Sequence, residues 1–302
     1  LGKALGKKSL NIDVKHGACG EAWKHISTYF GLPIELHHAE PRSDFGNIEP
    51  NPTKYEHLSN PSPNAYFSAA NDPDGDRHAV LTADGLPLTP EELTVIITDY
   101  LATHAQQPAA IASTLASSHR IAYICQQLGI SYYETAVGFK YIAPHLETGK
   151  QSNSIYLGVE SSGGFSSSTH TLEKCGFLPI LALAAILEHQ NCSLTDLQRK
   201  IKTKYGTFIF TETEFKFQPK QKSAIQTFMN NSTPQSLAPH FEKNIEKINT
   251  TDGLKLYFSD QSWVLCRLSG TEPVMRIYAE SSEKETSKKR ENELLTLVKS
   301  TL

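Results

Sequence analysis

The chain has 302 residues, of which 39% are hydrophobic and 20% charged, and its formal net charge is −3 at pH 7. This length suits two or three domains, and the lack of a basic excess argues against nucleic acid as a main partner. The longest apolar run, 177–187, is too short for a membrane span, and five scattered cysteines without a secretory signal favour a cytoplasmic protein with reduced thiols.

The first part of the chain alternates strand and helix patterns. Residues 9–14 predict a strand, and residues 20–32 predict an amphipathic helix. Its apolar side is expected to carry Trp23, Ile26, Tyr29 and Phe30. Residues 40–64 are rich in proline and asparagine, which predicts an ordered surface loop. Residues 65–72 then predict a strand that ends at an acidic loop.

The second part, from about residue 85, repeats the alternation. Residues 89–105 predict a helix that Thr89 caps, with Pro90 in the first turn and Glu92 three residues after the cap. The remaining expected elements are strands at 109–115, 131–137 and 154–164 and helices at 117–130 and 177–190. Alternating strands and helices favour βαβ units with mixed, mostly parallel sheets.

The third part has a different pattern. A polar stretch leads to short expected strands at 253–260, 262–270 and 274–281. A charged segment at 282–300 predicts a closing helix. Strands followed by one terminal helix indicate a small α+β domain.

The acidic loop, AANDPDGDRHAV at 69–80, places Asp72, Asp74 and Asp76 at alternate positions. An ordinary solvated turn would account for its residue types. A hard divalent cation explains the spacing better, because alternate positions of an extended loop can point three carboxylates the same way. A calcium EF-hand is excluded, since its glycine and its last acidic position are occupied here by Arg77 and Ala83.

Three further loops combine polar groups with glycine. In residues 266–278, arginines flank a Ser-Gly-Thr turn, which suits a phosphate cradle and equally an ordinary hairpin with two surface arginines. Residues 158–165 place Glu160 and Ser162 beside two glycines, where they could contact sugar hydroxyls. Residues 134–142 place Lys140 shortly after a glycine. The last two patterns are weak on their own.

In this order, the four loops resemble those of the α-D-phosphohexomutases, the phosphoglucomutase and phosphomannomutase family. DPDGDR resembles the magnesium loop of that family, TAVGFKYI its third-domain lysine loop, GVESSGG its sugar loop and RLSGTEPVMRIY its fourth-domain phosphate loop. The resemblance covers nearly the whole chain. It implies family domain II at 1–84, domain III at 85–212 and domain IV at 213–302. The implied architecture is two α/β/α domains followed by the α+β domain.

The resemblance also implies a role for each matching residue. Asp72, Asp74 and Asp76 would bind Mg²⁺. Arg77 and Lys140 would act near the reacting phosphate and the substrate, and Glu160 and Ser162 would contact the hydroxyls of the sugar. The phosphate that does not react would be held by Arg267, Ser269, Gly270, Thr271 and Arg276.

Several positions depart from the family pattern. Cys175 stands where the family has aspartate, which bears on how the substrate is positioned. The other departures are Ala136, Ser161 and Leu268. The first-domain phosphoserine loop of the family has no match, because neither 58–64 nor 117–121 fits it in order or context.

The resemblance therefore implies domains two to four of a phosphohexomutase, inactive alone, with the N-terminal domain of the same protein as a missing partner. The implied reaction converts glucose 1-phosphate into glucose 6-phosphate through a bisphosphate, since ESSGG is nearer the phosphoglucomutase branch. Two alternatives stay open. One is a phosphomannomutase, and the other is a sugar-phosphate-binding protein without catalysis.

Overall fold

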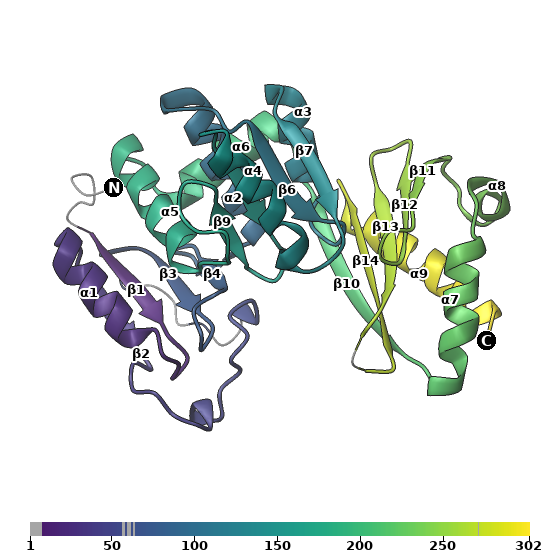
Figure 1. The fold of residues 1–302 in the computed structure, drawn as a ribbon, viewed down its shortest axis with the longest axis horizontal. Helices are drawn as coiled ribbons and strands as arrows, with labels where there is room; N and C mark the ends of the chain where they lie inside the picture. The colour runs from purple at the N-terminus through teal and green to yellow at the C-terminus, as the bar shows by residue number, and fades with distance from the viewer. Residues whose placement is uncertain (1–7, 56–57, 59–61, 63, 271) are drawn as a thin grey trace. The chain divides into compact units, whose positions relative to one another are not determined.

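The structure, a computed structural model, describes residues 8–55, 58, 62, 64–270 and 272–302 (Figure 1). The residues divide into two units by their contacts. The first unit contains Leu1–Glu134 and Gly138–Tyr205, and the second contains Thr135–Val137 and Gly206–Leu302.

The first sheet of the first unit has the strand order β2-β1-β3-β4-β5. Its strands are β1 (Ser9–Asp13), β2 (Ile34–His37), β3 (Ala65–Asn71), β4 (His78–Leu81) and β5 (Pro87–Leu88). β1 runs parallel to β2 and β3, whereas β4 runs antiparallel to β3 and β5. Every residue of β3 and β4 is buried, as in strands that are covered on both faces. The acidic loop is thus the connection of a buried hairpin.

The second sheet of the first unit has the order β7-β6-β8-β9. Its strands are β6 (Ala110–Thr114), β7 (Ser131–Thr135), β8 (Tyr156–Val159) and β9 (Phe165–Ser167). β6 and β8 are parallel, and β8 and β9 are antiparallel. The turn between β8 and β9 carries the expected sugar loop at 160–164.

The helices of the first unit are α1 (Gly20–Phe30), α2 (Pro90–His104), α3 (Arg120–Leu128), α4 (Ala143–Gln151), α5 (Phe177–Gln190) and α6 (Leu194–Tyr205), with short 3₁₀ turns η1 (Phe45–Asn47) and η3 (Phe139–Tyr141). The predicted capping box of α2 is present, with reciprocal hydrogen bonds between Thr89 and Glu92. α5 contacts α2, β3, β4 and β9, which explains why it is apolar on several sides. One hydrophobic cluster joins α1, α2, α3, α5 and α6 to both sheets, whereas Leu146 of α4 belongs to a separate cluster with Ala112 and Phe139.

No single helix among the described residues is long and apolar enough to cross a membrane. By length and composition alone, α5 and α6 pass that test together, as a pair bent by 90°.

The second unit is built on one antiparallel sheet of order β10-β14-β13-β12-β11 (Figure 1). Its strands are β10 (Ile209–Lys216), β11 (Ile245–Asn249), β12 (Leu254–Phe258), β13 (Trp263–Leu268) and β14 (Val274–Ser281). Helix α9 (Lys284–Ser300) packs on β10, β13 and β14, and its Leu294 and Val298 enter the core. The remaining helices are α7 (Lys222–Asn231), α8 (Pro234–Leu237), η4 (Pro219–Gln221) and η5 (Ala238–His240).

The expected α/β class with mixed sheets and a C-terminal α+β unit is confirmed. One residue of the expected apolar helix side is not buried, because the side chain of Tyr29 is 83% exposed and rests edge-on against Phe30. The expected boundary between residues 212 and 213 falls inside β10, which pairs along its whole length with β14. In the structure, the main segment of the second unit begins at Gly206. Parts of the expected surface loop, 56–57, 59–61 and 63, lie outside the described residues.

Candidate functional site

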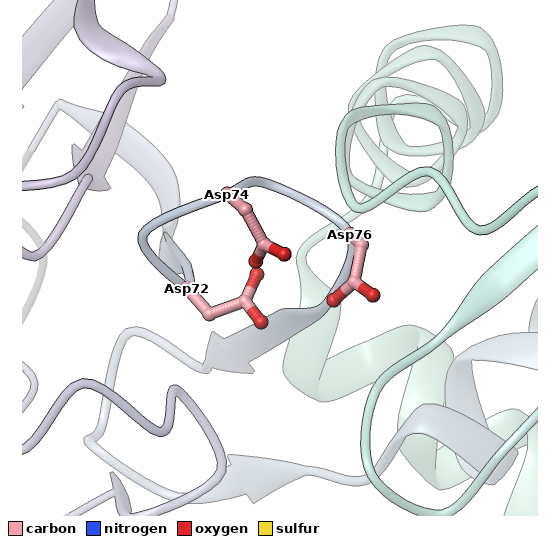
Figure 2. A group of neighbouring side chains, drawn as sticks. All are labelled: Asp72, Asp74 and Asp76. Atoms are coloured by element: carbon pink, nitrogen blue, oxygen red, sulfur yellow. The ribbon is translucent and has the colours of Figure 1, made fainter.

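The acidic loop brings its three carboxylates together (Figure 2). One oxygen from each of Asp72, Asp74 and Asp76 lies within 4.8 Å of the others. Asp72 is buried, Asp76 is half-buried and Asp74 is exposed. Gly75 allows the tight turn between them at a φ of +77°, and its N–H donates to the Asp72 carbonyl (3.0 Å). Clustered carboxylate oxygens, one of them open to solvent, suit a hard divalent cation.

Two cations stand among these carboxylates. Arg77 donates to Asp72 from its backbone N–H (3.0 Å) and from Nε, and Nζ of Lys174 lies 2.5 Å from Asp76. Burial raises the pKa of Asp72 to about 6, against the opposing effect of Arg77. Burial also acts on Asp76, but hydrogen bonds from Lys174 and Asp72 outweigh it and lower the pKa of that carboxyl. The negative charge of the loop is therefore partly compensated by the protein itself.

A hydrogen-bonded support lies beneath the loop. The Trp23 indole donates to Oδ1 of Asn71 (2.8 Å), and Nδ2 of Asn71 donates to the Arg77 carbonyl (2.9 Å). The N–H of Gly176, at the start of α5, donates to the Gly75 carbonyl (2.9 Å). Both ends and the middle of the loop are thus tied to buried parts of the first unit.

The turn before α1 also contacts the loop. Ala18 donates its N–H to the Pro73 carbonyl (2.7 Å), and a Cβ at Gly17 would lie 2.2 Å from Cα of Pro73. A side chain at Gly17 is therefore incompatible with this backbone approach, which accounts for the glycine at this position.

We expect Trp23→Phe to destabilise the first unit by about 1–3 kcal/mol, because the buried Oδ1 of Asn71 loses its donor while most of the ring packing stays. Urea denaturation followed by circular dichroism measures this change. Tyr29→Phe in the same helix is the control, and its midpoint should stay within error because Tyr29 is exposed. Equal midpoints for the two variants would show that the indole hydrogen bond does not support the loop.

The expected sugar loop lies directly beside the acidic loop. Its turn is closed by hydrogen bonds from Glu160 N–H to the Gly164 carbonyl (2.9 Å) and from Gly163 N–H to the Glu160 carbonyl (3.1 Å). A β-bridge joins Arg77 to Gly164. Glu160 is buried, Ser162 is exposed, and burial raises the pKa of the Glu160 carboxyl, which the charge of Lys174 opposes. The structure therefore brings both expected loops into one site.

Lys174 is a site residue that sequence analysis missed. Its ammonium pairs with Asp76 at 2.5 Å, and its charge acts on Glu160, so it links the two loops. The sequence feature that could have indicated Lys174 is its place directly before Cys175, a position that departs from the family pattern. Cys175 itself is half-buried and donates its N–H to the Phe165 carbonyl (2.8 Å).

The lysine loop places Lys140 at the surface, and its role near the substrate stays a prediction. Lys140 is exposed on η3, with Nζ 5.0 Å from the centre of the Tyr141 ring. Within the described part of the chain, no ion pair joins Lys140 to the acidic loop. The backbone of Gly138 instead hydrogen-bonds Glu160, so this loop reaches the site through its main chain.

The expected phosphate loop lies in the second unit, between β13 and β14. Arg267 and Arg276 are direct cross-strand partners, so their side chains leave the same face of the sheet. Ser269 donates its N–H to the Val274 carbonyl (2.8 Å) at the base of the turn. Gly270 follows in the turn, and Thr271 lies outside the described residues. The hairpin therefore brings both arginines to one place, as expected.

Carboxylates accompany this arginine pair. Arg267 donates through Nε to Asp252 (2.8 Å), and Nε of Arg276 lies 3.3 Å from Glu214 and 3.9 Å from Glu212. Like charges on opposing strand positions repel each other, and these carboxylates reduce that repulsion. Arg276 remains about half exposed, so it is accessible to a solvent anion.

Taken together, the fold and the sites define a multidomain α/β protein with a carboxylate cluster suited to a hard cation. Residues 3–85 match the family model described as phosphoglucomutase/phosphomannomutase, alpha/beta/alpha domain II, and residues 89–205 match that of domain III. Residues 215–297 match the C-terminal domain of the same family. The chain therefore belongs to the phosphoglucomutase/phosphomannomutase family, and the resemblance of its loops to domains II to IV is confirmed.

Curated relatives carry phosphoglucomutase names. Phosphoglucomutase 1 of Drosophila melanogaster is 24% identical over 319 residues, covering 94% of this chain and 56% of the relative. Phosphoglucomutase-1 of Homo sapiens is 28% identical over 315 residues, covering 92% of this chain and 55% of the relative. The chain thus spans about half the length of the curated relatives it matches.

Solved structures share the fold at low identity. A phosphoglucomutase/phosphomannomutase family protein from Burkholderia thailandensis superposes with a TM-score of 0.78 at 18% identity, covering 99% of this chain and 62% of that one. Aspergillus fumigatus N-acetylphosphoglucosamine mutase, in complex with GlcNAc-6P and magnesium, has a TM-score of 0.66 at 15% identity, covering 98% and 66%.

Proposed function

We propose that this chain is the metal-binding, sugar-binding and phosphate-binding part of a magnesium-dependent phosphohexomutase. One observation carries the proposal. The carboxylates of Asp72, Asp74 and Asp76 cluster beside the loop of buried Glu160, with Lys174 between them. A cation and a polar sugar would therefore meet in the first unit. The magnesium and GlcNAc-6P bound to the fungal mutase support this reading.

Mg²⁺ would be held by the three aspartates, and it would supply positive charge to a transferring phosphoryl group. Arg77 and Lys174 would add fixed positive charge at the same place, and Lys140 would act from the rim of the site. Glu160 would accept hydrogen bonds from sugar hydroxyls, and the exposed Ser162 would donate one. The non-reacting phosphate is assigned to the loop of Arg267, Ser269, Gly270, Thr271 and Arg276.

The preferred substrate is glucose 1-phosphate, converted into glucose 6-phosphate through the bisphosphate. The phosphoglucomutase names of relatives at 24–28% identity support this choice. Mannose phosphates are the second candidate, because the matched family includes phosphomannomutases. A non-catalytic sugar-phosphate-binding role is the third. The cytoplasm is the proposed location.

Calorimetric titration of the 302-residue chain in Mg²⁺ with glucose 1-phosphate, mannose 1-phosphate and inorganic phosphate tests the proposal. Glucose 1-phosphate should bind most tightly, and Glu160→Gln should weaken it more than it weakens phosphate. Equal affinities for all three would contradict sugar recognition.

A coupled assay should show no interconversion by these residues alone, because none of them resembles the serine loop of the family. Turnover would overturn that expectation.

For the phosphate loop, we expect Arg267→Lys to weaken phosphate binding by about tenfold. A lysine point charge cannot replace the guanidinium fork, whose charge-assisted hydrogen bonds are worth about 1.5–3 kcal/mol each. The measurement is a phosphate titration followed by the NMR shifts of the Ser269 and Gly270 amides. Arg199→Lys, at an exposed position paired with Asp196, is the matched control. Amides that stay unmoved in millimolar phosphate would make the turn purely structural.

A further inference from the structure

His78 begins β4, two residues after Asp76, and is buried. Its backbone nitrogen and its ring Nδ1 both hydrogen-bond one acceptor, the carbonyl oxygen of Gly163. The backbone N–H donates to the carbonyl of Gly163 at 3.0 Å, and Nδ1 lies 2.6 Å from the same oxygen. A carbonyl oxygen can only accept, so the proton of the neutral ring is on Nδ1.

The other ring nitrogen, Nε2, indicates that the hydrogen bond of Nδ1 is the reason for a histidine at this position. Nε2 is buried and has no hydrogen-bond partner among the described residues. A buried polar atom without a partner is unfavourable, and a leucine would fill similar space without it. The ring therefore carries that cost while Nδ1 makes a single side-chain hydrogen bond, to Gly163.

Gly163 in turn determines the shape of the sugar loop. Its φ is +97°, and a Cβ there would lie 2.4 Å from the His78 carbonyl oxygen, so the two backbones are in direct contact. Its N–H donates to the Glu160 carbonyl, which closes the turn that carries the buried carboxylate. A displacement of Gly163 would therefore move Glu160 relative to Asp76.

We infer that His78 is a positioning residue. Its Nδ1–H holds the carbonyl of Gly163 and thereby sets the place of Glu160 beside the acidic loop. The effect on sugar recognition rests on the proposed function. The hydrogen bond that locks the loop does not depend on any ligand. His78 touches neither the cation nor the sugar in this role.

The first experiment measures hydrogen exchange of the Glu160 and Gly163 amides in His78→Leu and His78→Asn. Asparagine retains an N–H donor one bond beyond Cγ, where histidine has Nδ1, so it should keep exchange near the wild-type rate. Leucine should raise it about tenfold or more. Equal exchange in wild type and the leucine variant would overturn the inference. His78→Phe, which keeps a ring without a donor, replaces the leucine variant if that chain does not fold.

The second experiment compares two affinities in the same variants. His78→Leu should weaken glucose 1-phosphate binding about tenfold and leave Mg²⁺ affinity within twofold. His78→Asn should bind glucose 1-phosphate with nearly the wild-type affinity. A general packing defect would lower both affinities and would not be rescued, which would contradict positioning. If wild type binds no sugar phosphate while exchange behaves as expected, the proposed function fails and the locking role of His78 stands.

Discussion

Replacing Asp74 with alanine is expected to lower Mg²⁺ affinity by about 100-fold or more. Asp74 is the exposed member of the carboxylate cluster, and among the described residues no side-chain cation pairs with it. Under the proposed function its removal would delete a metal ligand directly, whereas loss of a group that only orients a ligand already costs about 10–100-fold in metal affinity. Folding should hardly change, because the side chain faces solvent and the turn depends on Gly75.

Calorimetric titration with Mg²⁺ measures the affinity. Thermal unfolding with and without Mg²⁺ independently measures how much Mg²⁺ binding stabilises the native state. In wild type, Mg²⁺ should raise the unfolding midpoint, since a ligand that binds the native state stabilises it. Asp84→Asn is the matched control, because Asp84 is an exposed carboxylate in a neighbouring turn of the same sheet. Identical titrations of wild type and the Asp74 variant would reduce the acidic loop to a solvated turn.

Sequence patterns predicted the features that depend on neighbouring residues. The capping box of α2 needs only Thr89 and Glu92, three positions apart, and it forms as expected. The carboxylates of the acidic loop converge as their alternate spacing predicted, in a turn that Gly75 allows at a φ of +77°. The arginine pair required one further assumption, that residues 267 and 276 flank a hairpin, and their cross-strand pairing confirms it.

Contacts between distant segments could not be read from any local pattern. Lys174 pairs with Asp76 because the start of α5 packs against the acidic loop. The two segments are nearly 100 residues apart in the chain. The bond from His78 to Gly163 spans 85 residues. These contacts depend on how the β3–β4 hairpin is placed against the start of α5 and against the β8–β9 turn, which no periodicity specifies.

Strand β10 was missed for a related reason. Its sequence, IFTETEFK, alternates apolar and polar residues only weakly, and Glu212 and Glu214 gave it a polar character. In the structure, both carboxylates lie near Arg276 of the neighbouring strand. The partner that makes these charges favourable in a sheet is more than 60 residues away, so the segment reads as a polar connection on its own. Tyr29 shows the reverse case, a residue on the expected apolar side of a helix whose side chain is 83% exposed.

Gly163→Ala is expected to destabilise the first unit by about 3 kcal/mol or more. The new Cβ would lie 2.4 Å from the carbonyl oxygen and 3.0 Å from the nitrogen of His78, and backbone atoms cannot swing away as a flexible side chain could. Overpacking of this kind costs about 1–3 kcal/mol, and a φ of +97° adds backbone strain of similar size for any residue with a Cβ.

Gly129→Ala separates these two contributions. Gly129 also has a positive φ, +67°, but a Cβ there meets no atom within 4 Å, so only backbone strain of about 1–2 kcal/mol is expected. Urea denaturation of both variants, with equal m-values as the check on two-state behaviour, measures the difference. A Gly163 variant no less stable than the Gly129 variant would mean that the sugar loop can move away from β4. The contact between Gly163 and His78 would then not be what holds Glu160 beside the acidic loop.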